Sequence, residues 1–129
     1  MAFANLGGNR QGALNSWGPP VWQKGNLMLY LVQGTYIEET YDTNNVCQSV
    51  VFVRSEPFTT NLSETLDQLN LPTGLVWTQL PSTDPNYIGW SLNNSAYYVT
   101  SFKAIFNNQM AYWRSYATPQ GVIMTGLSQ

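Results

Sequence analysis

The sequence contains no histidine, and only 9% of its 129 residues are charged. Histidine is the commonest general base and the commonest metal ligand, so the usual basis for acid–base catalysis and for a zinc site is missing. Five basic residues against seven acidic ones give a net charge of −2, which leaves no excess positive charge to bind phosphate or anionic lipid. We therefore expect no catalytic residues, no cofactor and no metal, and neither nucleic acid nor a membrane as partner.

Cysteine and long apolar runs are also scarce. The one cysteine, Cys47, cannot form a disulfide within the chain, and its apolar neighbours favour a buried thiol over a reactive one. The longest apolar run, residues 27–32, is far shorter than the roughly 20 residues of a membrane-spanning helix. The first residues lack the basic and apolar segments of a secretion signal. We expect a cytoplasmic protein at synthesis, with no signal peptide.

The pattern of apolar residues predicts a mainly β protein. Alternation predicts strands over 27–37, 46–54, 97–106, 110–117 and 122–127. The asparagines at 107 and 108 fit a hairpin turn, and the side chains at 102, 104 and 106 share one face of that hairpin. Antiparallel pairing of these strands leads us to expect a β-sandwich or barrel. No internal repeat is visible.

One short helix is predicted at about residues 62–69. Asn61 precedes it as N-cap and Glu64 follows three positions later, which is a capping-box spacing. Leucines at positions 62, 66 and 69 then fall on one helical face. The sequence predicts no other helix.

Residues 1–26 differ from the rest of the chain. They hold five of the ten glycines and the pair Pro19-Pro20, with neither strand nor helix periodicity. We therefore predict an extended N-terminal arm before a single β-rich domain, 27–129. The arm carries large apolar side chains that are costly to expose, so it should lie on its own domain or on a neighbouring subunit. The arm residues expected to bind a partner are Arg10, Trp17, Trp22 and Lys24.

Neutral polar side chains take the place of charged ones. The chain has 13 Asn, 9 Gln, 10 Ser and 12 Thr residues, with 5 Trp and 8 Tyr. Cores of protein interfaces are poor in charge and rich in Trp and Tyr. Together with the missing catalytic residues, this favours a non-enzymatic structural protein of a large assembly, bound to other copies of itself or to a larger protein shell. The composition is typical of accessory virion proteins that decorate or cement a capsid or form a tail or connector, which would place the chain in the virion.

An alternative hypothesis is a β module that binds a glycan or a peptide. Aromatic rings stack on sugars and amide groups bind hydroxyls, and a few placed polar groups on an apolar surface are what such sites need. Residues 86–94 combine both kinds of side chain in a turn-rich segment. The possible ligand loop consists of Tyr87, Trp90, Asn93 and Asn94.

Overall fold

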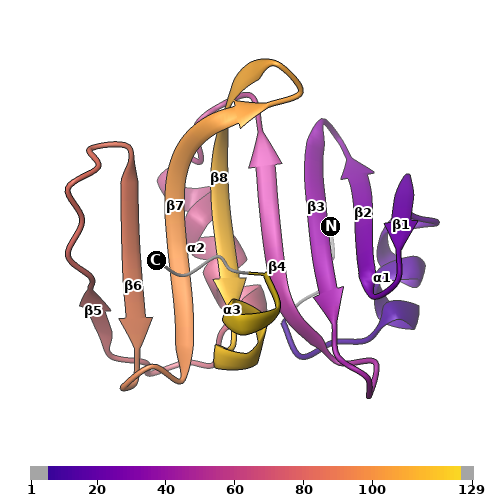
Figure 1. Ribbon diagram of the computed structural model, residues 1–129, viewed down its shortest axis with the longest axis horizontal. Coiled ribbons are helices and arrows are strands. Elements are labelled where there is room, and N and C mark those ends of the chain that lie inside the picture. The colour runs from indigo at the N-terminus through magenta and orange to yellow at the C-terminus, as the bar shows by residue number, and fades with distance from the viewer. Residues whose placement is uncertain (1–5, 126–129) are drawn as a thin grey trace.

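We describe a computed structural model of the chain over residues 6–125. These residues form one antiparallel sheet of eight strands, in the order β1-β2-β3-β4-β8-β7-β6-β5, with three helices (Figure 1). The helices are α1 (Arg10–Trp17), α2 (Thr60–Asn70) and α3 (Pro119–Thr125). The strands are β1 (Trp22–Lys24), β2 (Leu27–Val32), β3 (Thr35–Tyr41), β4 (Cys47–Arg54), β5 (Trp77–Gln79), β6 (Tyr87–Leu92), β7 (Tyr97–Phe106) and β8 (Gln109–Ala117).

The same order of elements occurs twice along the chain. Helix α1 precedes the strands β1 to β4, and α2 precedes β5 to β8, so each helix leads into a four-stranded meander. The last strands of the two meanders, β4 and β8, pair at the centre of the sheet. We call residues 10–54 the N-terminal unit and residues 60–117 the C-terminal unit. The two units share their order of helix and strands but not their amino-acid sequence, so the sequence shows no internal repeat.

The two faces of the sheet are covered differently. In Figure 1 the helix α3 lies in front of the sheet, while α1 and α2 lie behind it, and we call these the front and rear faces. The main core lies between the rear face and the two rear helices, where Ala13 of α1 and Leu66 of α2 join buried sheet residues such as Ile37, Phe52 and Tyr116. Burial of these side chains is the main contribution to stability.

The mainly β, antiparallel fold predicted from the sequence is confirmed, whereas the sandwich or barrel is not. The sheet does not close, and the three-residue strands β1 and β5 lie at its two edges. Helices cover the rear face where a sandwich would place a second sheet. Alternation within single strands predicts a half-buried sheet, but it carries no information on what covers the buried face.

The extended N-terminal arm is likewise not confirmed. The Asn9 side chain accepts a hydrogen bond from the Gly12 N–H at 2.9 Å and starts α1, and Gly18, with φ at 77°, ends it. The helix packs on the sheet through Trp17, whose ring lies 5.1 Å from that of Tyr30. The chain then adds β1 to the edge of the sheet. The glycines and prolines therefore act as a helix stop and a turn, not as a linker.

The predicted helix is confirmed as α2, with its start moved by two residues. Thr59, and not Asn61, is the N-cap, and its hydroxyl oxygen accepts a hydrogen bond from the Leu62 N–H at 3.1 Å. Leu66 is fully buried against the sheet, as the leucine spacing predicted. The hairpin of β7 and β8 is also confirmed, with Asn107 and Asn108 both at positive φ in its turn.

The strand predicted over 122–127 is wrong for the described part of that segment. Residues 119–125 form α3, because Thr118 caps the helix and Pro119 occupies its first position. Gly121 allows α3 to approach the sheet very closely, since a Cβ atom there would lie 1.9 Å from the Gln48 carbonyl oxygen. Residues 126 and 127 lie outside the described part of the chain.

Candidate functional site

A row of large apolar side chains crosses the front face of the sheet. Strand register places Tyr87 of β6 opposite Phe102 of β7, and Phe102 opposite Trp113 of β8. The row continues through Val53 of β4 to Tyr36 of β3 and ends at Leu31 of β2. We call these residues the front row: Leu31, Tyr36, Val53, Trp113, Phe102 and Tyr87. Each is a direct cross-strand neighbour of the next, so together they form one continuous apolar strip.

The aromatic rings of the front row stack on one another. The Phe102 and Trp113 ring centroids are 5.3 Å apart with 15° between the ring planes, and those of Tyr87 and Phe102 are 5.9 Å apart with 28° between them. Stacked neighbours on adjacent strands cover each other's faces, so these rings present mainly their edges to the space in front of the sheet. The front row therefore has the character of a packed apolar surface, not of separate ring platforms.

The front row lies between two structures that cover the ends of the front face. At one end Phe106, near the turn of the β7–β8 hairpin, contacts Tyr36 and Trp113 with ring centroids 5.0 and 5.6 Å apart. These rings cover Val53 and Ala111. At the other end α3 packs on β3, β4, β7 and β8. Within residues 6–125 no helix covers the middle of the front row (Figure 1).

Few charged groups lie close to the front row. The neighbouring cross-strand row contains Glu38, Val51, Ser115 and Thr100, and the hydroxyls of Thr100 and Ser115 share a hydrogen bond. Burial raises the pKa of Glu38, which makes the charged form of this one carboxyl less favourable. The front face therefore has little charge to desolvate on contact with another surface.

The rear face holds a buried polar cluster that joins α2 to the sheet. The Arg114 guanidinium donates to the Asp67 carboxylate at 2.8 Å and to the Tyr116 hydroxyl at 2.8 Å. The Tyr116 hydroxyl in turn donates to Asp67. Arg114 also lies over the ring of Trp90, 5.7 Å from its centroid. Each polar group of this cluster is used in an internal contact, which fits a structural role for it.

A second buried polar cluster lies under α1. The Glu39 side chain is fully buried and accepts hydrogen bonds from the Tyr41 hydroxyl and, at 3.7 Å, from the Cys47 thiol. Burial raises the pKa of Glu39 to about 7, although both hydrogen bonds oppose that shift. Burial and the neighbouring Glu39 raise the pKa of the Cys47 thiol. A thiol that keeps its proton is a poor nucleophile, so the cluster has no activated group to offer a substrate.

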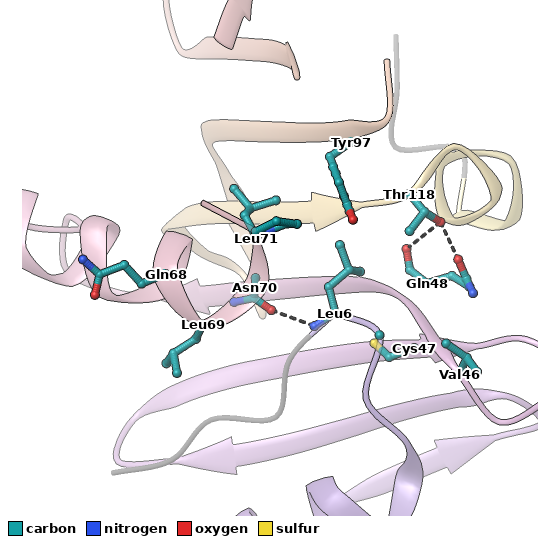
Figure 2. A pocket seen from close by; sticks show the side chains of 12 residues that line it. Leu6, Val46, Cys47, Gln48, Gln68, Leu69, Asn70, Leu71, Tyr97 and Thr118 are labelled. Atoms are coloured by element: carbon teal, nitrogen blue, oxygen red, sulfur yellow. Dashed lines mark hydrogen bonds between the residues drawn. The ribbon is translucent and has the colours of Figure 1, made fainter. Parts of the chain in front are cut away.

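A pocket of about 380 Å³ lies at one end of the rear face, between α2, the β3–β4 turn and the start of β7, and Figure 2 shows its lining side chains. Its walls carry no charged side chain, and its polar groups are largely bonded within the protein. Asn70 accepts from the Leu6 N–H at 3.0 Å, and Thr118 donates to the Gln48 side chain. The twelve lining residues are Leu6, Gly7, Val46, Cys47, Gln48, Gln68, Leu69, Asn70, Leu71, Pro72, Tyr97 and Thr118. This lining does not support nucleophilic or acid–base chemistry.

The structure separates the four predicted arm residues into two pairs. Arg10 and Trp17 are used internally, since Arg10 lies 5.1 Å from the centroid of the Tyr41 ring and Trp17 packs on Tyr30. Trp22 and Lys24 lie on the edge strand β1 and are exposed. The latter two remain accessible to a partner.

The structure also separates the predicted ligand loop. Tyr87 and Trp90 lie three positions apart on β6, so their side chains point to opposite faces of the sheet. Asn93 and Asn94 form the β6–β7 turn at positive φ, and the Asn93 side chain accepts a hydrogen bond from the Val76 N–H at 2.8 Å. Tyr87 belongs to the front row, while Trp90 is part of the rear face.

Sequence reasoning missed most of the front row. The shared face of Phe102 and Phe106 was visible from their spacing, and the structure confirms it through the strand register. Trp113 joins that surface through the β7–β8 hairpin, whereas Val53 and Tyr36 join it only because β4 and β8 pair at the centre of the sheet. Pairing of strands so far apart along the chain leaves no local signal in the sequence.

Comparison with known proteins gives no family for this chain. No family model and no curated protein sequence matches it. A crystal structure of a DUF4309 family protein (YjgB) from Bacillus subtilis is similar, with a TM-score of 0.46 and 13% sequence identity over 86% of this chain and 78% of that one. No helix in residues 6–125 is long and apolar enough to span a membrane, and the same residues contain no cluster of three or more potential metal ligands. A similarity this weak supports no conclusion about what the chain does.

Proposed function

We propose that the chain is a non-enzymatic structural subunit that contacts another protein through the front face of its sheet, as part of a larger assembly. The partner is another copy of the chain or a protein of a larger shell. An accessory protein of a virus particle, as the composition favours, is one case of this proposal. The exposed Trp22 and Lys24 on β1 extend the same contact surface to the edge of the sheet.

The front row is the observation that supports this proposal. It is a continuous apolar strip in which no residue is charged, and no helix of residues 6–125 covers its middle. Val53 is buried beneath its neighbours' rings, and the other five side chains are half-buried or exposed. Contiguous apolar surface on the outside of a folded domain commonly marks a site of protein contact. Interface cores are depleted in charged residues and enriched in aromatic ones, as this surface is.

The glycan-binding alternative has less support from the ring geometry. A sugar needs an open ring face, whereas Phe102 and Trp113 cover each other's faces. One side of the Trp90 ring is occupied by Arg114, and Trp77 meets that ring edge-on at 5.6 Å. A glycan array tests this alternative, which predicts hits with the parent chain that are lost with Trp90→Ala.

Site-specific photo-crosslinking in the cells or particles that contain the chain tests the proposed contact. A benzophenone amino acid replaces Tyr87 in the front row, and in a matched control it replaces Gln11, which is exposed on α1. We expect a discrete adduct with a protein, identifiable by mass spectrometry, from position 87 only. Excess parent chain should compete for that adduct, and excess Leu31→Lys/Tyr87→Lys variant should not. Equal adducts at both positions, or none at position 87, would contradict the proposal.

A further inference from the structure

The edge strand β5 has backbone N–H and C=O groups to which no other strand of residues 6–125 bonds. The Leu80 N–H donates to the Gly89 carbonyl at 2.8 Å, and the Asn93 N–H donates to the Val76 carbonyl at 3.0 Å. The backbone polar groups of residues 76 and 80 are therefore directed toward β6. In an antiparallel pair, every second residue of a strand directs its backbone N–H and C=O groups to the partner strand. Between residues 76 and 80 of β5, that residue is Thr78, which lies opposite Ser91. The N–H and C=O groups of Trp77 and Gln79 therefore point outward from the edge of the sheet.

The two edges of the sheet are protected to different degrees. Both edge strands have a proline close by, Pro20 before β1 and Pro81 after β5, but of the two only β1 carries a lysine, Lys24, which hinders the addition of another strand. Around β5, residues 75–83 contain no charged residue. The Val76 side chain there is 69% exposed. The edge at β5 is therefore open to pairing, while its counterpart at β1 is guarded.

We propose that β5 pairs with β5 of a second copy of the chain, antiparallel and around a two-fold axis at Thr78. This register places Trp77 opposite the second copy's Gln79, and Gln79 opposite the second copy's Trp77. All four residues have outward-pointing backbone groups, so both pairs are hydrogen-bonded pairs. The two sheets then form one continuous sheet across the dimer.

The same register also matches the side chains. Residues 76, 78 and 80 alternate with 77 and 79, so they lie on the front face together. The exposed Val76 is then opposite the second copy's Leu80, and Thr78 is opposite its own copy. Every cross-strand pair is uncharged, which favours the second copy as the occupant of this edge.

Two-fold pairing at β5 uses up the open edge and leaves the guarded β1 edges at both ends. An isologous contact of this kind closes on itself, so the expected product is a dimer and not a fibre. The contact does not involve the front row, and the front faces of both copies remain available for the contact proposed above.

The mass of the chain, measured by sedimentation velocity and light scattering from about 1 to 100 μM, tests this pairing. We expect a monomer–dimer equilibrium in the parent. Val76→Lys should weaken dimerisation by at least about tenfold, because it places a lysine at the open edge. The matched control is Val21→Lys, at the corresponding position before β1, where the side chain is 58% exposed. This control should leave the dimer unchanged.

Two results would overturn the inference: a monomeric parent over the whole range, or an equal loss of dimer in Val76→Lys and Val21→Lys. Circular dichroism checks that both variants are folded, which their exposed positions favour. Hydrogen exchange gives a second readout, since the Trp77 and Gln79 amides should become protected as the concentration rises. The Leu31→Lys/Tyr87→Lys variant should still dimerise, which separates failure of this pairing from failure of the front-face contact.

Discussion

The N-terminal and C-terminal units each hold their helix with an acid, an arginine and a tyrosine, and the acid and the arginine exchange places between helix and sheet. In the C-terminal unit the acid, Asp67, is on the helix and Arg114 is on the sheet, whereas in the N-terminal unit Arg10 is on the helix and Glu39 is on the sheet. In both units a tyrosine hydroxyl donates to the carboxylate and the arginine lies over that tyrosine's ring. The arrangement is shared, although the strands that supply the tyrosines do not correspond.

The two units differ in whether the acid has a basic partner in contact. Arg114 and Asp67 form an ion pair at 2.8 Å. The other ion pair among residues 6–125 joins Arg54 and Glu56, so Glu39 is buried with hydrogen bonds only. Its pKa is raised by burial, to about 7. A buried carboxyl group without a cation in contact becomes neutral near physiological pH. A carboxylate paired with a cation stays charged, and removing that cation then destabilises the fold.

Removing the arginine of the C-terminal unit should have the largest effect. Arg114→Met leaves Asp67 without its cation in a partly buried site, and we expect a loss of about 3 kcal/mol in unfolding free energy. Denaturant unfolding measures this loss. The double variant Asp67→Asn/Arg114→Met should recover part of it, because no charge is then left unpaired. The control Arg54→Met, which breaks the exposed pair with Glu56, should cost less than about 1 kcal/mol. Similar losses in Arg114→Met and Arg54→Met would contradict this account.

The acid of the N-terminal unit should instead make stability depend on pH. Because the pKa of Glu39 is raised on folding, from 4.5 to about 7, the folded chain binds this proton more tightly than the unfolded chain. The protonated Glu39 therefore contributes fully to the unfolding free energy below about pH 4.5, and this contribution is lost as the pH rises to and through about 7. The loss is up to about 3 kcal/mol.

Unfolding free energies over this pH range, for the parent and for Glu39→Gln, measure the effect. The variant keeps a neutral acceptor for the Tyr41 hydroxyl, so it should lack this part of the decline and be the more stable protein above pH 7. Glu64→Gln, which removes an exposed carboxyl from α2, serves as the control. A parent and a Glu39→Gln variant with parallel pH profiles would show that Glu39 is not the group responsible.

Glycine-to-alanine changes in two helices should have opposite effects on stability, because one glycine is packed closely against the sheet and the other is not. Gly121→Ala would place a Cβ atom 1.9 Å from the Gln48 carbonyl oxygen, so α3 must move away from the sheet. We expect a loss of about 2 kcal/mol, as for other overpacked sites. Gly12→Ala on α1 meets only the Asn9 side chain at 3.5 Å, an ordinary contact, and should stabilise the chain by about 0.5 kcal/mol. Thermal unfolding of both variants measures these changes, and equal shifts would mean that α3 does not pack as described.

The local patterns in the sequence predict those elements whose residues repeat with a clear period. Alternation identified β4, β7 and β8, and the leucine spacing identified α2. The single strand predicted over 27–37 is wrong, because Gln33 and Gly34, both at positive φ, turn the chain between β2 and β3. Helix α1 was missed because Ala13 is the single buried residue among its eight, so it has almost no apolar face. Helix α3 was read as a strand because Val122 and Ile123 are β-branched, and the cap at Thr118 outweighs that preference.

The arrangement of the elements was harder to predict than the elements themselves. Whether a sheet closes depends on contacts between distant segments, such as β4 with β8, and no local period reports them. The front row needs the same pairing, because Val53 and Tyr36 come next to Trp113 only through it, whereas Phe102 and Trp113 already face each other in the predicted hairpin. A residue's type indicates that it can bind a partner, but it does not indicate that Arg10 packs on Tyr41 and Trp17 on Tyr30 within the chain.

The N-caps of the two rear helices are expected to contribute less than the Arg114–Asp67 pair, Glu39 or Gly121, and they bring the two units together again. Asn9 caps α1 and Thr59 caps α2, each by accepting a hydrogen bond from a backbone N–H three residues on. Asn9→Ala and Thr59→Ala should each cost about 1 kcal/mol in unfolding free energy. Asn61→Ala, at the position where the capping-box spacing predicted the cap, should cost clearly less, because Asn61 lies inside α2. If Asn61→Ala is the more damaging change, α2 begins where the sequence pattern placed it and the start seen in the structure is wrong.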